Sequence, residues 1–526
     1  MHKLPLWRCG TIFFSLLLVA FAFAESQVTF STESSISNNS INGLGATQSS
    51  LIKDSTYLNM LSVRADGSTE NANYSLSIGG KVTDDPQADI KKMTLTQIQG
   101  RVTSGKHTVV LGDCFESFSQ YALSSGLKGV AYRLGEDNNS TPSISLIYGV
   151  AYPRWDNFTN DTRVKTIRRT AYGMRVKVPT SSTLTLGLSG VRSNDSAPVN
   201  PTDALYDANT YAIDWDYRPF DGLSLQGDVA QSNADVTAGA VKTKESGMAY
   251  RMTITGDADP SRVTLDYERV SPDFVTTLGS ASTDREKAKL RWRFKQNKQY
   301  TWNYNLLWYH DNLDNKKAGT TTHLKPEIGV SIRKPFQRKQ ATLRCTTQLD
   351  HVNGQQQGND LGFNVGYTDT FGKWDNDTNV GFTNYKSKGT RDANEWTANT
   401  SVSTRISGES IVYKPEFRIG TWRNADELSN LTDLTYEYSA GLGLDFPESN
   451  FGTSFRVGQN RLLRDTAGDD SNKVFGNVTL TYRPQGTLGK YINNFFVRAQ
   501  YNDYSFTTKA NNFRETSFTG GLNFQY

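Results

Sequence analysis

The chain has 526 residues, with 57 basic and 53 acidic side chains, five histidines and three cysteines. This near balance of charge argues against a nucleic-acid-binding protein, which would concentrate basic charge. Three cysteines are too few for a fold built on disulfides. Many Tyr, Phe, Asn, Thr and Gly residues, with aromatics at 11%, are instead typical of a large exported β protein.

The first 24 residues have the pattern of a secretory signal peptide. Lys3 and Arg8 come before the apolar run TIFFSLLLVAFAFA, which ends in the small-x-small sequence Ala22-Phe23-Ala24. We expect cleavage after Ala24, which leaves residues 25–526 as one domain. No later window approaches the roughly 18 apolar residues that a membrane-spanning helix needs.

From Arg163 onward, apolar and polar residues alternate strictly in one segment after another, as in strands with two different faces. In AYGMRVKV, for example, Tyr172 and Met174 alternate with Arg175 and Lys177. Tight turns recur roughly every 40 residues, and a longer polar loop such as RSNDSAPVNPTDALYD or HDNLDNKKAGT lies between each pair of turns. The turns fall near Pro179, Pro219, Asp259, Asn297, Pro335, Phe371, Gly408, Pro447 and Pro484. Short turns alternating with long loops favour a membrane-spanning β-barrel over a soluble β-sandwich.

The C-terminus carries an independent signal. The last strand alternates apolar residues and ends in an aromatic one: Phe518, Gly520, Leu522, Phe524 and Tyr526. This pattern resembles the C-terminal signal by which the barrel assembly machinery recognises bacterial outer-membrane barrels. The resemblance implies that machinery as a partner, the lipid of the Gram-negative outer membrane as the surroundings, and a last strand that ends in the periplasm.

Counting strands through the less regular N-terminal third completes the predicted architecture. Strands are expected at Gln27–Glu33, Ser55–Arg64, Asn71–Lys81, Lys91–Val102, Lys106–Asp113, Gly126–Leu134 and Ser143–Tyr152. The total is 26, within a range of 22 to 26, and an even number suits a single-chain bacterial barrel. The sequence therefore predicts an all-β protein, a single large antiparallel up-and-down transmembrane barrel with short periplasmic turns and long external loops.

One external loop, the third, is unusually apolar. In the stretch VVLGDCFESFSQYALSSGLKGVAYRL, the loop from Asp113 to Ser125 holds several large apolar side chains. In porins the third loop folds back into the barrel, and a similar fold here would pack Phe115, Phe118, Tyr121 and Leu123 against the inner wall. Asp113 and Glu116 would then lie near the passage, facing the wall residues Arg175, Arg251 and Arg291. The inner face should also carry the pore-lining candidates Arg293, Arg344 and Arg418. The alternatives are an external loop with its own apolar cluster, or simply longer strands.

No catalytic or cofactor site is predicted. The histidines after residue 24 are not next to a nucleophile motif, and Gly-x-Ser-x-Gly does not occur. Cys-x-x-Cys-His is also absent, so the chain attaches no c-type haem itself. Clusters such as DNDTN are more typical of solvated turns than of Ca²⁺ sites. The chain is therefore expected to be neither an enzyme nor a metal or cofactor carrier.

The width of the barrel bears on whether the chain is a sleeve around another protein or a solute channel. A 26-stranded barrel would measure roughly 40–50 Å across its backbone, and the chain offers no plug domain. The stretch GD…SFSQYALSSGLKG is similar to one in large outer-membrane barrels of metal-reducing bacteria. A large barrel without a plug or haem motifs also resembles the porin-like sleeves that enclose a multihaem c-type cytochrome, and this resemblance implies electron transfer across the outer membrane. The cysteine pair found near the start of some such sleeves is absent. The alternative is a solute-diffusion porin narrowed by the third loop.

Overall fold

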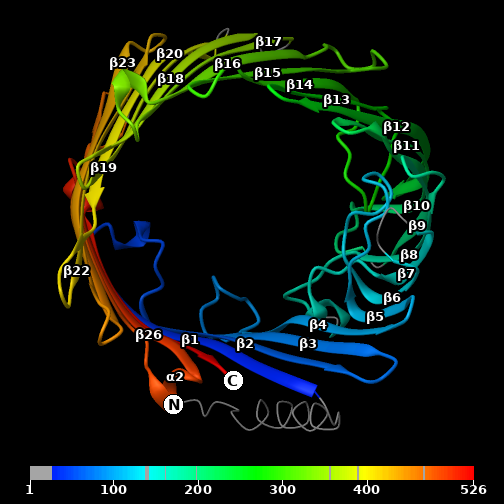
Figure 1. Cartoon of the computed structure of the whole chain (residues 1–526), viewed down its shortest axis with the longest axis horizontal. Coiled ribbons are helices and arrows are strands. Elements are labelled where there is room, and N and C mark those ends of the chain that lie inside the picture. Colours follow the sequence, from blue (N-terminus) through cyan, green and yellow to red (C-terminus); the bar gives the residue numbers. More distant parts are fainter. Residues whose placement is uncertain are drawn as a thin grey trace.

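The computed structural model describes residues 26–526 except 137–140, 160, 197, 355–356, 388–389 and 466–467. The expected signal peptide, residues 1–24, lies outside the described residues. The rest forms one closed antiparallel sheet, seen as a ring in Figure 1. The prediction of a single up-and-down β-barrel is confirmed.

Twenty-six strands build the wall, and each pairs with its neighbours in sequence. The first half consists of β1 (Ser26–Asn42), β2 (Asp54–Ser68), β3 (Asn73–Thr83), β4 (Met93–Ser104), β5 (His107–Cys114), β6 (Leu127–Leu134), β7 (Ser143–Val150), β8 (Arg168–Pro179), β9 (Leu184–Ser196), β10 (Ala204–Phe220), β11 (Leu223–Ala238), β12 (Val241–Ala258) and β13 (Ser261–Val270).

The second half contains one extra short strand, β21, which continues the edge of β20. Its strands are β14 (Arg285–Lys295), β15 (Tyr300–Asp311), β16 (Thr322–Arg333), β17 (Thr342–Asn353), β18 (Gly358–Phe371), β19 (Trp374–Ser387), β20 (Arg391–Thr404), β21 (Ile406–Ser407), β22 (Val412–Asp426), β23 (Leu431–Phe446), β24 (Phe451–Arg464), β25 (Ser471–Tyr482), β26 (Ile492–Phe506) and β27 (Phe513–Gln525). Short helical turns are η1 (Ala46–Gln48), η2 (Trp155–Thr159), η3 (Pro335–Gln337), α2 (Gly486–Gly489) and η4 (Lys509–Asn511). None of the described helices is long and apolar enough to cross a membrane.

The first and last strands close the barrel. β1 pairs antiparallel with β27 from Ser31 opposite Gln525 to Asn42 opposite Arg514. The Phe30 N–H also donates to the Tyr526 carbonyl at 2.9 Å, and the Tyr526 N–H donates back at 2.8 Å. Closure leaves no unpaired strand edge, which a barrel in lipid requires.

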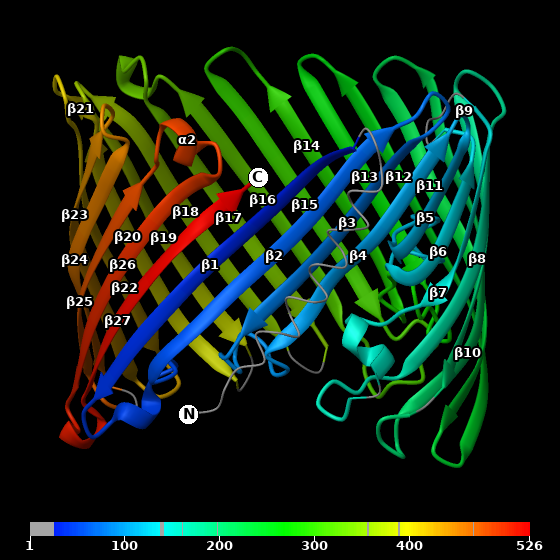
Figure 2. The same ribbon diagram turned by 90° about the horizontal axis from the view of Figure 1, so that it is seen from below.

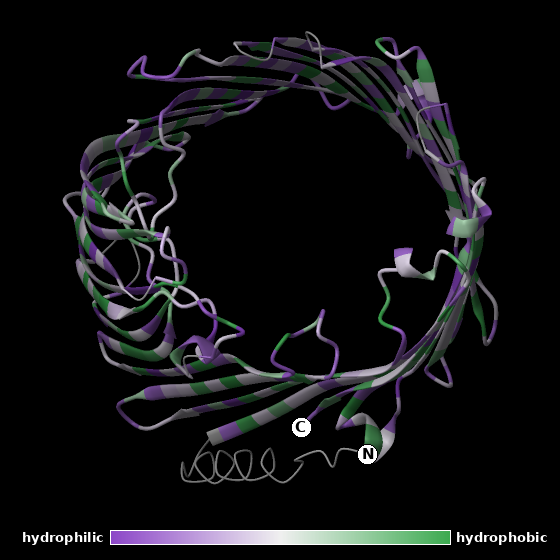
Figure 3. Cartoon of the chain, turned by 180° about the vertical axis from the view of Figure 1, so that it is seen from behind, coloured by the Kyte–Doolittle hydropathy of each residue, from purple (hydrophilic) through white to green (hydrophobic). Residues whose placement is uncertain are grey.

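The two faces of the wall follow from the alternation in sequence. Successive side chains of a strand point to opposite faces, so the apolar set Tyr172, Leu188 and Ile213 points outward, with 53%, 56% and 51% of each residue exposed. Figure 3 shows apolar and polar residues alternating along the strands. An outer face of exposed apolar side chains is stable only where lipid covers it, so the chain is a membrane-spanning barrel.

Strands tilt across the wall and connect at two rims, as Figure 2 shows. We call the rim that holds Tyr526 the C-terminal rim and the other the loop rim. All nine tight turns predicted from sequence connect strands at the C-terminal rim, for example at residues 221–222, 259–260 and 372–373. From β8 to β27, every tight turn therefore lies at the same rim as the end of the last strand, as the sequence predicts.

Some loops at the loop rim are shorter than the sequence suggested. The predicted loop at residues 192–207 shrinks to residues 197–203, because Asn194 of β9 still pairs with Asp207 of β10. Likewise β11 and β12 are joined by residues 239–240 alone. Polar residues can continue a strand beyond the lipid-facing band, since backbone pairing does not depend on an apolar side chain.

Besides Pro179 and Pro219 near the ends of β8 and β10, two prolines lie farther inside strands, and each of these two sits at a break in the pairing. Between β16 and β17 the ladder stops at Leu324 and resumes at Glu327, so Pro326 needs no N–H for that strand. Pro415 lies just beyond the point where pairing of β20 with β22 ends, at Glu416. Proline lacks the donor that a central strand uses, and the wall accommodates both residues by interrupting one ladder.

Candidate functional site: the lumen shelf and the basic arc

The inner wall from β8 to β12 is lined at one level by small side chains. Ala171, Ala212, Ala230 and Ala249 are at most 4% exposed although they belong to the inward-facing sets of their strands. Such a stripe leaves room for backbone to approach the wall closely. The residues that cover it come from two loops of the loop rim.

We name these two loops together the shelf: residues 115–126, which join β5 to β6, and residues 271–284, which join β13 to β14. Figure 1 shows both projecting into the ring from the same side. Phe118, Tyr121 and Leu123 of the first loop and Phe274 and Leu278 of the second share one buried cluster with the small wall residues. The third external loop therefore folds inward, as in the porin-like alternative.

The two loops of the shelf bind each other as well as the wall. Tyr121 and Phe274 meet edge to face at 5.8 Å between ring centroids. The Thr276 hydroxyl donates to the Tyr121 carbonyl at 2.7 Å, and the Ser124 N–H donates to the Leu278 carbonyl at 3.0 Å. These contacts make the shelf one packed unit.

Side chains of the wall form hydrogen bonds with the shelf. The Tyr121 hydroxyl donates to Glu268 of β13 at 3.0 Å, and burial followed by the charge of Glu268 raises the pKa of Tyr121 far above its usual range. Arg175 of β8 donates to the carbonyls of Ser117 and Phe118 at 2.9 and 2.7 Å. These bonds satisfy loop backbone that would otherwise lose its partners on burial.

The structure corrects the expected partners of the loop carboxylates. Asp113 does not face Arg175 or the other wall arginines, because it binds Lys128 of the neighbouring strand at 2.7 Å. Glu116 pairs with Arg133 at 2.7 Å in the same way. Adjacent strands place these basic groups nearer than the lumen wall does, so local pairing satisfies both carboxylates.

Phe115 is the one predicted apolar contact that does not form. It is 64% exposed, whereas Phe118 is 4% and Leu123 is 0% exposed. Residue 115 directly follows the last residue of β5, so the chain has not yet turned back toward the wall. The apolar content of the loop is therefore explained by Phe118, Tyr121 and Leu123.

Sequence reasoning missed the second loop of the shelf. No prediction singled out SPDFVTTLGSASTD, residues 271–284, although it holds Phe274, Val275 and Leu278. The stronger signal lay in the strands, where inward positions are Ala, Gly or Ser in place of charged residues. Gly247 illustrates it, because a Cβ there would lie 2.4 Å from the Phe274 nitrogen.

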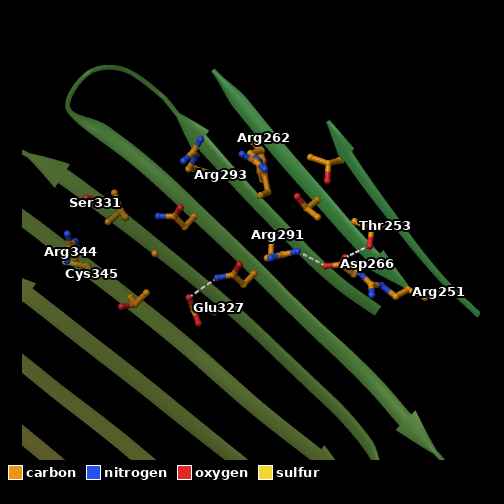
Figure 4. A pocket seen from close by; sticks show the side chains of 18 residues that line it. Arg251, Thr253, Arg262, Asp266, Arg291, Arg293, Glu327, Ser331, Arg344 and Cys345 are labelled. Atoms are coloured by element: carbon orange, nitrogen blue, oxygen red, sulfur yellow. Dashed lines mark hydrogen bonds and ion pairs between the residues drawn. The ribbon is translucent and has the colours of Figure 1, made fainter. Parts of the chain in front are cut away.

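Beside the shelf, the inner wall from β12 to β17 carries a concentration of arginines. A hollow of about 840 Å³ is lined by five arginines and two carboxylates, and Figure 4 shows them on neighbouring strands. We call the five arginines the basic arc: Arg251, Arg262, Arg291, Arg293 and Arg344. Four of the predicted pore-lining arginines thus meet in one region.

The arginines of the basic arc differ in their ion-pair and hydrogen-bond partners. Arg291 binds Asp266 at 2.7 Å, and Arg251 binds the side chain of Gln120 in the shelf. Glu327 accepts a hydrogen bond from Asn305 at 3.0 Å. The other two candidate arginines lie outside the arc: Arg175 binds the shelf, and Arg418 of β22 pairs with Glu416 at 2.5 Å.

A separate polar cluster ties two outer loops together. Asp89, between β3 and β4, is buried beside Arg154, which lies between β7 and β8 and donates to it at 2.9 Å. Burial raises the pKa of Asp89, but hydrogen bonds from Arg154, the Lys91 N–H and Thr94 outweigh it and hold the pKa well below its usual range. This cluster links the loop between β3 and β4 to the loop between β7 and β8.

The described residues place no group of three or more His, Cys, Asp or Glu side chains where a metal ion could be held. Cys114 and Cys345 are both free thiols, and Cys114 is buried beneath the shelf. The arrangement consists of a polar wall with fixed charges and a packed shelf. Such a surface can bind and orient a passing or resident molecule.

No family profile matches the sequence, and no curated protein matches it either. Among solved structures, OccAB4 of Acinetobacter baumannii is similar, at 10% identity over 96% of this chain and 99% of that one, with a TM-score of 0.31. OpdK of Pseudomonas aeruginosa, solved with vanillate, aligns at 12% identity over 96% and 100% of the two chains, with a TM-score of 0.28. The translocation pore of the P pilus usher PapC aligns at 10% identity over 94% and 99%, with a TM-score of 0.33. At these values the similarities add nothing to the fold already described and assign no function.

Proposed function

We propose that this chain is a porin-like conduit of the Gram-negative outer membrane whose lumen encloses a folded partner protein. The observation that carries the proposal is the closed ring of 26 strands, whose described loops leave the centre of the ring uncrossed (Figure 1). Figure 1 shows none of the described ribbon crossing the centre of the ring.

Width is the physical reason for a partner. A ring of this strand number measures roughly 40–50 Å across the backbone, and side chains on both sides leave about 30–40 Å. A folded domain of about 100 residues has a radius of gyration near 13 Å, so it would fit the opening. An empty lumen of that width would abolish the permeability barrier of the membrane.

A multihaem c-type cytochrome is the partner class that the resemblance to porin-like sleeves implies, and it would make the barrel an electron conduit. The polar inner wall suits such a role, because it can hold a hydrophilic protein through many hydrogen-bonded contacts. Orientation follows from the C-terminal signal, which places the C-terminal rim in the periplasm.

The second candidate is a solute-diffusion channel. The inward fold of the third external loop favours it, since Phe118, Tyr121 and Leu123 are fixed on the wall as a constriction loop requires. In this case the shelf would be one side of a narrower passage, and the basic arc would set a preference for anions.

Purification from the native membrane in a mild detergent separates the two candidates. An enclosed partner should remain with the barrel as a second, haem-staining chain in constant ratio, and the barrel expressed alone should give very large conductance in planar bilayers. A barrel that purifies alone and shows small, solute-selective conductance would refute the sleeve and establish the channel.

A further inference from the structure

The basic arc contains a charge arrangement that the barrel itself does not neutralise. Arg262 of β13 and Arg293 of β14 are direct cross-strand partners on the inner face. Like charges placed directly opposite each other destabilise a sheet. Arg262 has one loose pairing, to Asp257 at 3.4 Å with both side chains half exposed.

Among the described residues, Arg293 and Arg344 have no ion-pair or hydrogen-bond partner, and both are exposed to the lumen. The carboxylates of the hollow lie deeper and are already engaged: Asp266 by Arg291 and Thr253, and Glu327 by Asn305. Positive charge that is unpaired or only loosely paired is therefore concentrated on Arg262, Arg293 and Arg344, which we call the rim arginines.

The rim arginines lie close to the C-terminal rim. Arg262 is two residues from the turn at 259–260, Arg293 is two residues before the end of β14, and Arg344 is two residues after the start of β17. Strands are about 4.8 Å apart, so the step from β13 to β17 covers roughly 19 Å of wall. One small anion could bridge Arg262 and Arg293, but only an extended acidic surface can reach all three.

We propose that the rim arginines form a docking surface for an acidic face of the enclosed partner protein, on the periplasmic side of the lumen. This inference rests on the proposed function and adds the chemistry of the partner and the side at which it is held. Arginine suits the task, because its planar guanidinium group binds carboxylates with two hydrogen bonds.

The test uses the full-length barrel expressed alone in an uncharged detergent, with a fluorescent oligoglutamate of about ten residues as the probe. Extended, that peptide spans roughly 33 Å, enough to cover all three rim arginines. Fluorescence anisotropy should show binding near 0.1 M salt that is lost near 1 M, where the Debye length falls from about 10 Å to about 3 Å. Oligolysine of equal length should not bind.

The triple variant R262Q/R293Q/R344Q should weaken oligoglutamate binding about tenfold or more, since three charge contacts are removed. The matched control is R498Q, on the inner face of β26 opposite Thr479 and Thr519, which should bind as the native barrel does. R293Q alone relieves the repulsion between Arg262 and Arg293, so it should fold normally. It should lose part of the affinity because it removes one of the three docking charges.

Two outcomes would overturn the docking surface. Equal weakening by R498Q would show general attraction to a basic wall, and competition by citrate or inorganic phosphate at concentrations as low as those of the peptide would show a small-anion site. Neither outcome touches the copurification result, so failure of the docking surface can be distinguished from failure of the sleeve on which it rests.

Discussion

A single added methyl group should lift the shelf from the wall. At Gly247 of β12 a Cβ would lie 2.4 Å from the nitrogen of Phe274 and 2.5 Å from its Cα. Carbon atoms in contact are about 3.5–4.0 Å apart, so Gly247→Ala requires the loop of residues 271–284 to move by roughly 1 Å. Overpacking of this kind costs about 1–3 kcal/mol, and the buried rings of Tyr121 and Phe274 give the shelf little freedom to adapt.

Cys114 provides a native reporter for this change. It is 1% exposed beneath the shelf, so a water-soluble maleimide can reach it only when the shelf opens. With Cys345→Ala removing the other thiol, a loss of about 2 kcal/mol should speed labelling roughly 30-fold. The control is Gly256→Ala on the same strand, where a Cβ meets nothing within 4 Å. Labelling of Gly247→Ala at the native rate would refute the packing of the shelf against the wall.

Three further predictions concern the rims of the barrel. Because the pKa of Asp89 is lowered in the folded state, its ionised form contributes stability above the unfolded pKa of about 3.9, and this contribution is lost as pH falls through the folded value. Asp89→Asn should therefore lower the free energy of unfolding in urea at neutral pH by about 1–3 kcal/mol. The variant should also lose less stability in acid than the native protein. If both proteins lose the same stability in acid, Asp89 is not the source of the acid sensitivity. Lys316→Cys, in the loop after β15, should react with an impermeant maleimide on intact cells whereas Phe336→Cys should not, and the opposite pattern would invert the barrel. Deleting residues 524–526 removes the pairing of Tyr526 with Phe30 and should leave the chain degraded in the periplasm, so normal membrane levels on a heat-modifiability gel would argue against the assembly signal.

The architecture was predictable because a barrel strand carries its signal locally. Alternation needs only neighbouring residues, so the period-two pattern around Tyr172 and Met174 fixes both the strand and its two faces. Turn residues mark the ends in the same local way, and Asp259 and Pro447 indeed lie at connections of the C-terminal rim. Strand ends at the loop rim were less predictable, because polar residues can either continue a ladder or leave it.

The site was predictable only in part, because its contacts join residues far apart in the sequence. That the loop after β5 folds inward could be inferred from Phe118, Tyr121 and Leu123 alone. Its partner Phe274 is more than 150 residues away, and no local pattern links the two. The pairings of Asp113 and Glu116 failed for a related reason: a distant basic wall was considered, while Lys128 and Arg133 on the adjacent strand were nearer.

The arginines of the inner wall fall into two groups: those that bind the shelf and those that do not. Counting both groups together overstates the number of arginines that are free to bind another molecule. Arg175 and Arg251 bind polar groups of the shelf, so their charge is partly committed to holding loop residues such as Phe118 and Gln120. The rim arginines have no such task within the barrel. If the shelf were lost, the Arg251 guanidinium would be free to bind other groups in the same hollow that Arg293 lines. The shelf thus limits how many hydrogen-bond donors of the wall are available to an anion, and shelf variants should be tested for anion binding as well as for stability.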